Sequence, residues 1–282
     1  MTQKRLQMTF DPGSEQGLGA VVVLLHGLLL DHSIFSDQLE RLAKQGFRVI
    51  SLSYAGHGGS DRLGVGPSVG AMADQVFAML DELGISEPVV LGGLSMGGYV
   101  AFAGLEKYRQ RIRGLVLMNT KAVPDTPEEA ANRQRACELI RQAKSISPLA
   151  MTMLPRLLGK STMRHKPEVW QKVARILDCM DLEAACDALI ALANRPDRRP
   201  MLAGIDVPTL VIAGEEDLIS TPEEMELIAK EIAGSEFVII PGVGHLSTLE
   251  EPEQVGKVLA RFLQKYFNND GYPDKKRSSV DA

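Results

Sequence analysis

The chain has 282 residues, of which 45% are hydrophobic and 24% are charged, and its formal net charge at pH 7 is −5. These values are typical of a globular protein with a sizeable core, and they give no reason to expect nucleic acid or an anionic membrane as a partner. The three cysteines form no CxxC pair, and the sequence has no signal-peptide pattern and no apolar run of about 20 residues. We therefore expect a reduced, soluble, cytoplasmic protein without a metal site.

Short apolar runs predict the strands of a buried parallel sheet, because they are rich in Val, Ile and Leu and show little alternation. An alternating stretch at Arg5–Phe10 predicts an edge strand ahead of them. The six runs are Ala20–Leu25, Val49–Leu52, Val89–Leu91, Leu115–Met118, Thr209–Ala213 and Phe237–Ile240. Helical segments lie between and after them, at Phe35–Gln45, Val69–Leu83, Tyr99–Tyr108, Glu223–Ala233 and Glu253–Phe267. The alternation predicts an open α/β sheet with helices on both sides.

The region 123–208 lacks strand patterns and predicts helices only. It opens on a capping box, Thr126-Pro127-Glu128-Glu129, and Asp181 is a second candidate N-cap residue. We interpret 123–208 as a helical cap over the carboxyl edge of the sheet, where ligands bind in open α/β folds. Residues 1–122 and 209–267 then form the core, and the polar segment 268–282 is predicted to be a disordered tail.

The pentapeptide Gly93-Leu94-Ser95-Met96-Gly97 lies between a predicted strand and a predicted helix. A sharp turn with serine at its apex in this setting is typical of a nucleophile elbow. The flanking glycines leave room for the strand and the helix to pack closely. Because a serine hydroxyl is a weak nucleophile at its own pKa, the hypothesis also needs a base, an orienting acid and donors for an oxyanion.

His245 is the candidate base, because among the five histidines only this one lies just beyond the last predicted strand, in a glycine-flanked loop. Asp217 follows the preceding strand and is the candidate orienting acid. Its neighbours Glu215 and Glu216 are predicted to form a solvated acidic turn. These choices bring Ser95, Asp217 and His245 to the same edge of the sheet.

The predicted oxyanion donors are the backbone N–H groups of Met96, directly after the serine, and of Leu28, in the loop after the first strand. Leu29 and Leu30 follow in that loop and are predicted to line the substrate pocket. All four residues are apolar. The pattern therefore predicts an apolar pocket that suits an uncharged acyl group.

Other polar residues near the predicted site are expected to have structural roles. His26 and His57 lie in glycine-containing turns, where an imidazole commonly braces the loop through hydrogen bonds to the backbone. An arginine of the cap could bind a carboxylated substrate, but arginines on amphipathic helices more commonly face solvent. The candidates are Arg133, Arg135, Arg141 and Arg156.

Four motifs together resemble the α/β-hydrolase superfamily: the HG loop at 26–27, the GHGGS turn at 56–60, the GLSMGG elbow at 93–98, and the GEED and GVGH segments at 214–217 and 242–245. The order serine, acid, histidine is also that of the superfamily. More narrowly, the chain is similar to the cap-bearing branch with carboxylesterases, 3-oxoadipate enol-lactonases and carbon–carbon bond hydrolases. This resemblance implies a Ser–His–Asp triad, an acyl-enzyme intermediate, no cofactor and a lid over the pocket.

Three functions stay open at this point. The first is a serine esterase that acts on small esters or lactones. The second uses the same residues for carbon–carbon hydrolysis, a lyase step or perhydrolysis. The third is a ligand-sensing protein with little turnover. Ser95 argues against the activities of haloalkane dehalogenases and epoxide hydrolases, which resemble this fold but carry Asp at the elbow.

Overall fold

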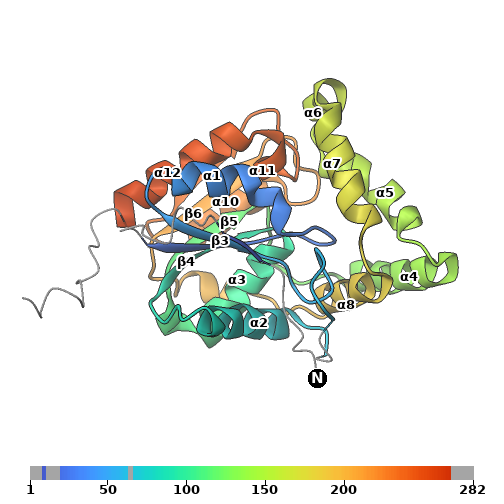
Figure 1. Cartoon of the computed structure of the whole chain (residues 1–282), viewed down its shortest axis with the longest axis horizontal. Helices are drawn as coiled ribbons and strands as arrows, with labels where there is room; N and C mark the ends of the chain where they lie inside the picture. The colour runs from blue at the N-terminus through green and yellow to red at the C-terminus, as the bar shows by residue number, and fades with distance from the viewer. Residues whose placement is uncertain (1–7, 11–19, 63–65, 268–282) are drawn as a thin grey trace, which may run out of the picture.

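The computed structural model describes residues 8–10, 20–62 and 66–267, and its centre is a seven-stranded sheet (Figure 1). The strand order is β1-β3-β2-β4-β5-β6-β7, with β2 to β7 parallel and β1 antiparallel to β3. The strands are β1 (Met8–Phe10), β2 (Val21–Leu25), β3 (Arg48–Leu52), β4 (Val89–Leu94), β5 (Ile112–Met118), β6 (Thr209–Gly214) and β7 (Glu236–Ile240). Strand β4 therefore lies at the middle of the sheet.

Helices cover both faces of the sheet, as its apolar strands require. Helices α1 (Ser36–Ala43) and α12 (Pro252–Phe267) bury their apolar sides on one face. Helices α2 (Val69–Glu82), α3 (Met96–Lys107) and α10 (Pro222–Glu231) do so on the other. Side chains of β2 alternate between the two resulting clusters: Val22 and Leu24 enter the first, and Val21, Val23 and Leu25 the second.

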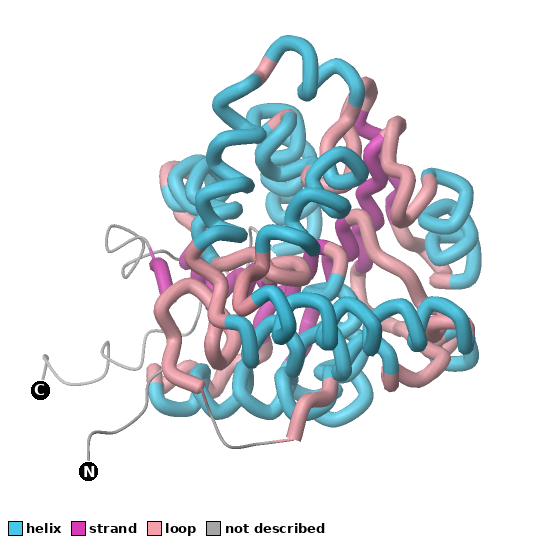
Figure 2. The backbone as a smooth tube through the Cα atoms, turned by 90° about the vertical axis from the view of Figure 1, so that its right-hand side faces the viewer, coloured by secondary structure: helices cyan, strands magenta, loops and turns pink. Residues whose placement is uncertain are grey.

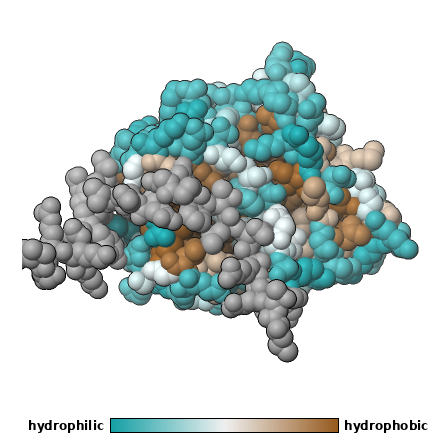
Figure 3. Space-filling model, in the orientation of Figure 1, coloured by the Kyte–Doolittle hydropathy of each residue, from teal (hydrophilic) through white to brown (hydrophobic). Residues whose placement is uncertain are grey.

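A group of helices between β5 and β6 lies beside the sheet core rather than on its faces (Figures 1 and 2). The helices are α4 (Pro127–Ala143), α5 (Ser147–Leu157), α6 (Lys160–His165), α7 (Pro167–Asp178) and α8 (Leu182–Ala193). The short helix α9 (Arg199–Leu202) follows them and packs against α10. Helix α4 packs along α8, and α5 packs against both α4 and α7. In the space-filling view, hydrophilic residues cover most of the outer helix surfaces, and hydrophobic residues show between the core and this helical group (Figure 3).

The predicted fold class, a mostly parallel α/β sheet flanked by helices, is confirmed. Each of the six predicted apolar runs contributes to a strand, and the predicted edge strand is present as Met8–Phe10. The rest of that prediction, at 5–7, and the predicted tail at 268–282 lie outside the described residues. The capping box at Thr126 forms as expected, and Asp181 accepts a hydrogen bond from the N–H of Ala184. No helix within the described ranges is long and apolar enough to cross a bilayer.

Candidate functional site

Ser95 lies at the turn between β4 and α3 with its backbone at φ 55° and ψ −114°. This left-handed region is costly for a residue with a side chain, so neighbouring contacts must enforce it. The Ser95 N–H donates to the carbonyl of Met118 at 2.9 Å, and the Ser95 carbonyl accepts from the Thr120 hydroxyl at 2.7 Å. A β-carbon at Gly93 or Gly97 would lie 2.1 Å from backbone atoms of Gly97 or Leu25, respectively. Glycine at both positions therefore allows the turn.

The side chains of Ser95, His245 and Asp217 form one hydrogen-bonded chain. Ser95 Oγ lies 2.8 Å from His245 Nε2, and His245 Nδ1 lies 2.8 Å from Asp217 Oδ2. All three residues are buried, with exposed fractions of 8%, 2% and 2%. With Nδ1 protonated and donating to the carboxylate, Nε2 is free to accept the Ser95 proton. The structure thus brings together the three residues that the sequence predicts.

Asp217 is held in its ionised form by the donors around it. Oδ1 accepts the N–H groups of Ile219 and Ser220 at 2.8 and 3.0 Å, and Oδ2 accepts the Asn119 amide at 2.9 Å in addition to His245. Burial alone would raise the pKa of Asp217, but the electrostatic interaction and hydrogen bond with His245, together with the other donors, lower it below its usual value. The carboxylate therefore stays charged and can orient the imidazole.

Glu215 and Glu216 form a turn directly after β6, as expected, with Glu215 exposed and Glu216 partly exposed. Glu215 accepts the Gly242 N–H at 2.7 Å, and Glu216 accepts the Lys160 N–H at 2.5 Å. These bonds tie the loop after β6 to the loop after β7 and to the start of α6. The sequence analysis did not anticipate these two bonds, because the backbone donors come from segments distant in the sequence.

The loop that carries Leu28 lies directly beside Ser95. Parallel pairing of β2 with β4 sets Leu25 opposite Gly93, and a β-carbon at Gly27 would lie 3.3 Å from Ser95 Cβ. Among the described residues, neither Leu28 N–H nor Met96 N–H donates a loop or turn hydrogen bond. Met96 is also the first residue of α3, whose N–H has no partner within the helix. Both predicted donors are thus available to a ligand.

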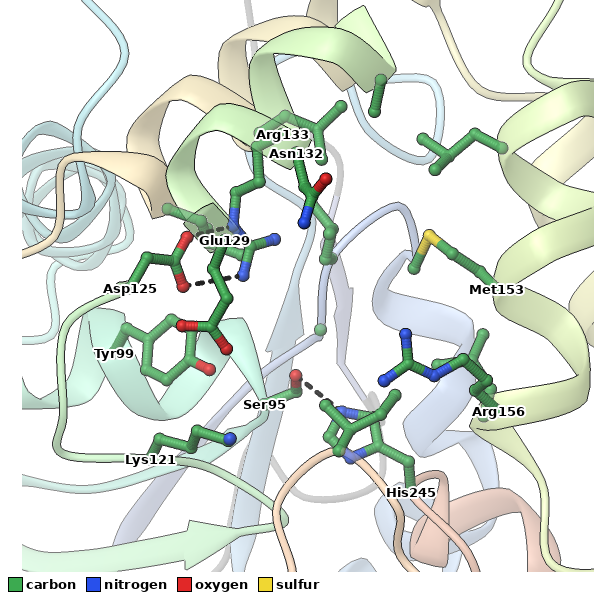
Figure 4. A pocket seen from close by; sticks show the side chains of 18 of the residues that line it. Ser95, Tyr99, Lys121, Asp125, Glu129, Asn132, Arg133, Met153, Arg156 and His245 are labelled. Atoms are coloured by element: carbon green, nitrogen blue, oxygen red, sulfur yellow. Dashed lines mark hydrogen bonds and ion pairs between the residues drawn. The ribbon is translucent and has the colours of Figure 1, made fainter. Parts of the chain in front are cut away.

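A cavity of about 720 Å³ lies between Ser95 and the helices α4, α5 and α8 (Figure 4). Leu30, one of the two predicted pocket residues, lines it, together with Leu28 and apolar residues of α5 and α8. Leu29 does not: its backbone is left-handed at φ 58°, and its side chain is fully buried in the core below the loop. The prediction for Leu29 was wrong because the side chain's direction depends on this local turn.

The cavity is not the uniformly apolar pocket that the sequence suggests. Charged residues also line it: Lys121, Asp125, Glu128, Glu129, Arg133, Arg156 and Arg195. Of the four cap arginines considered from the sequence, only Arg133 and Arg156 are among the lining residues. Helix packing decides which side of α4 and α5 faces inward, and the helical pattern alone did not reveal it.

The imidazoles of His26 and His57 brace loops, as expected. His26 lies 2.8 Å from the Gly27 carbonyl through Nδ1, and its Nε2 accepts the Tyr54 N–H at 3.3 Å. His57 Nδ1 lies 3.2 Å from the Ala55 carbonyl. Burial lowers the pKa of His57 to about 4, and burial together with the neighbouring His57 lowers that of His26 well below its usual value. Both rings are therefore neutral near pH 7.

Glu250 is fully buried beside the loop of His245, a role that the sequence analysis missed. Its carboxylate accepts the N–H groups of Gly244 and Leu246, which flank His245, each at 3.1 Å, and that of Gly159 at 2.7 Å. The His245 N–H in turn donates to the carbonyl of Leu157 at 3.0 Å. One carboxylate thus fixes the histidine loop and the connection between α5 and α6.

Asn119 is a second residue that the sequence analysis missed. Its amide donates to Asp217 Oδ2 and also to the Gly244 carbonyl at 3.2 Å, and its Oδ1 accepts the Ser247 hydroxyl at 2.7 Å. It follows β5 with φ 47°, a conformation that asparagine tolerates better than most residues. A polar residue directly after a buried strand was the available signal.

The chain is similar to several known proteins. The family described as "alpha/beta hydrolase fold" matches residues 20–252. The AB hydrolase superfamily protein YisY of Bacillus subtilis (strain 168) is 30% identical over 253 residues, which cover 87% of this chain and 92% of that protein. A malate-bound structure of a thermophilic esterase from Thermogutta terrifontis is 40% identical with a TM-score of 0.87, covering 94% and 96% of the two chains. The enol-lactonase from Burkholderia xenovorans LB400 is 30% identical with a TM-score of 0.83, covering 93% and 97%.

The burial of His57 predicts a loss of stability in mild acid. Unfolded His57 takes up a proton near pH 6.5, whereas the folded protein resists until about pH 4. The neutral, buried His57 therefore contributes fully to the free energy of unfolding above pH 6.5. This contribution falls as the pH drops toward 4, by on the order of 3 kcal/mol. Urea unfolding at several pH values should show that the free energy of unfolding declines less steeply with falling pH in His57→Asn than in the wild type. A matched change at the exposed His165, to Asn, should leave the decline unchanged, and equal slopes in all three proteins would contradict this account.

Because Glu250 is buried and accepts three backbone N–H groups, we expect its substitution by glutamine to lower both stability and activity. In Glu250→Gln an amide NH₂ replaces one carboxylate oxygen, so at least one backbone N–H beside His245 or at Gly159 loses its acceptor. We expect a loss of about 2–3 kcal/mol in the free energy of unfolding and a lower kcat for any reaction that uses His245. The control is Glu251→Gln, which removes only a partly exposed ion pair with Lys166 and should cost less than about 1 kcal/mol. Equal stability and activity of the two variants would refute the role of Glu250.

Proposed function

Because this chain belongs to the α/β-hydrolase fold family, we propose that it is a serine hydrolase that cleaves small carboxylic esters or lactones. The observation that carries the proposal is the hydrogen-bonded chain from Ser95 Oγ through His245 to Asp217, with 2.8 Å at each step. The esterase and enol-lactonase structures among its relatives support the same class of reaction.

In the proposed first step, Ser95 Oγ attacks the carbonyl carbon of the substrate. His245 Nε2 accepts the serine proton as the new bond forms, and Asp217 stabilises the imidazolium through Nδ1. The carbonyl oxygen becomes an oxyanion, which the N–H groups of Leu28 and Met96 bind. These dipoles are fixed by the β2 loop and the start of α3, so they need little rearrangement as charge develops.

Collapse of the intermediate then breaks the bond between the acyl carbon and the alcohol oxygen. His245 gives its proton to the departing alkoxide, and an acyl group stays on Ser95 Oγ. A water molecule then takes the alcohol's place: His245 removes its proton, the oxygen attacks the acyl carbon, and the carboxylic acid leaves as Ser95 regains its proton. In a lactone the alcohol and the acid belong to one molecule, so the product is a hydroxy acid.

Mutation of the nucleophile tests the proposal. Ser95→Ala should lower kcat/KM for short p-nitrophenyl esters at least roughly 1,000-fold, while Ser161→Ala, at an exposed serine of α6, should match the wild type. Asp217→Asn should cause a similar fall, because it removes the charge that orients His245. Chromatographic identification of the acid and alcohol products separates ester cleavage from other reactions. Full activity of Ser95→Ala would refute the assignment.

A further inference from the structure

Arg156 differs from the other cationic residues that line the cavity. Lys121 Nζ lies 3.0 Å from Glu224, and the guanidinium groups of Arg133 and Arg195 both pair with Asp125. Within the ranges 20–62 and 66–267, by contrast, no ion pair or hydrogen bond of the Arg156 side chain is found. A guanidinium carries a fixed charge and five N–H donors, so an anion is its natural partner.

The place of Arg156 near the reacting groups is firmly set. It is the penultimate residue of α5, and the carbonyl of the next residue, Leu157, accepts the His245 N–H at 3.0 Å. Two residues further on, Gly159 is bound by the buried Glu250. The end of α5 is thus fixed to the loop of His245 by hydrogen bonds. Figure 4 shows the Arg156 side chain pointing into the cavity on the side of His245.

The other side of the cavity carries charges of both signs. Glu128 and Glu129 belong to the first turn of α4 and line the cavity, and Figure 4 shows Glu129 across the cavity from Arg156. Asp125, on the same wall, is already paired with two arginines. The cations on this wall are paired with carboxylates, so an anionic group on a bound molecule would be attracted most strongly by Arg156, which has no ion pair among the described residues. The cavity can therefore orient a ligand that carries one negative end.

We infer that Arg156 binds a carboxylate of the substrate, so that the preferred substrates are esters or lactones with a second, ionised carboxyl group. This inference rests on the proposed ester hydrolysis and specifies its substrate class. The planar guanidinium matches a carboxylate with two parallel hydrogen bonds, while the ester carbonyl lies at Ser95. Arg156 then determines specificity by binding a part of the substrate that does not react.

Matched pairs of substrates test this inference on the full chain. One pair places the charge on the acyl side: the p-nitrophenyl monoester of adipic acid and neutral p-nitrophenyl hexanoate. The other places it on the alcohol side: the butyrate esters of 4-hydroxybenzoic acid and of its neutral amide. The ratio of kcat/KM within each pair cancels effects of a variant on the chemical step. Spontaneous hydrolysis is subtracted from every rate.

We expect Arg156→Gln to lower the acid-to-neutral ratio about tenfold in at least one pair, mainly through a higher KM for the acidic ester. Rates for the neutral esters should stay within about twofold of the wild type, and Arg156→Lys should keep part of the preference. Arg164→Gln removes the same charge from an exposed position on α6 that does not line the cavity, and its ratios should be unchanged.

The outcomes separate this inference from the proposed function. If the wild type cleaves the neutral esters through Ser95 but Arg156→Gln changes neither ratio, the carboxylate site is refuted and the esterase assignment stands. If Arg164→Gln lowers the ratios as much as Arg156→Gln, the effect is one of net charge and the site is again refuted. If the wild type cleaves no ester of either pair, both the function and the inference fail.

Discussion

The turn at Ser95 requires that β4, α3 and β2 pack with their backbones almost in contact. A single β-carbon at Gly93 or Gly97 would collide with backbone atoms that cannot move without displacing a strand or a helix. This close packing holds the Ser95 backbone in a conformation that it would not adopt alone. It also brings the β2 loop beside the hydroxyl, and it leaves the first N–H of α3 free. The nucleophile and the donors that we propose for the oxyanion thus have one physical origin.

The opposite side of the site depends on buried charge. Asp217 and Glu250 are carboxylates in the interior, and each is surrounded by N–H donors that compensate for the loss of water. Asp217 orients the His245 ring, while Glu250 fixes the backbone on both sides of that residue. Because Glu250 also binds Gly159, the helical region between β5 and β6 is attached to the same loop. Glu250 therefore helps to fix both the His245 loop and the end of α5, where Arg156 lies.

The sequence predicted most of the fold and the residues that meet at the sheet edge. Val, Ile and Leu runs identify buried strands, and Ser95, Asp217 and His245 each follow such a run within a recognisable turn. Glu250, Leu29 and the inward face of α5 were not predictable in this way. Their roles depend on which distant backbone donors lie nearby, on one left-handed residue, and on how α4 and α5 pack together. Local patterns carry none of this information, because tertiary contacts determine it.

The central claim is that Ser95 is a nucleophile activated by His245. Labelling with a fluorophosphonate tests it most directly, because the probe forms a stable bond with an activated serine hydroxyl and is not turned over. Peptide mass spectrometry should find the adduct on Ser95 of the wild-type protein, and His245→Ala should be labelled much more slowly. An adduct on another residue, no adduct at all, or equally fast labelling of His245→Ala would contradict the account.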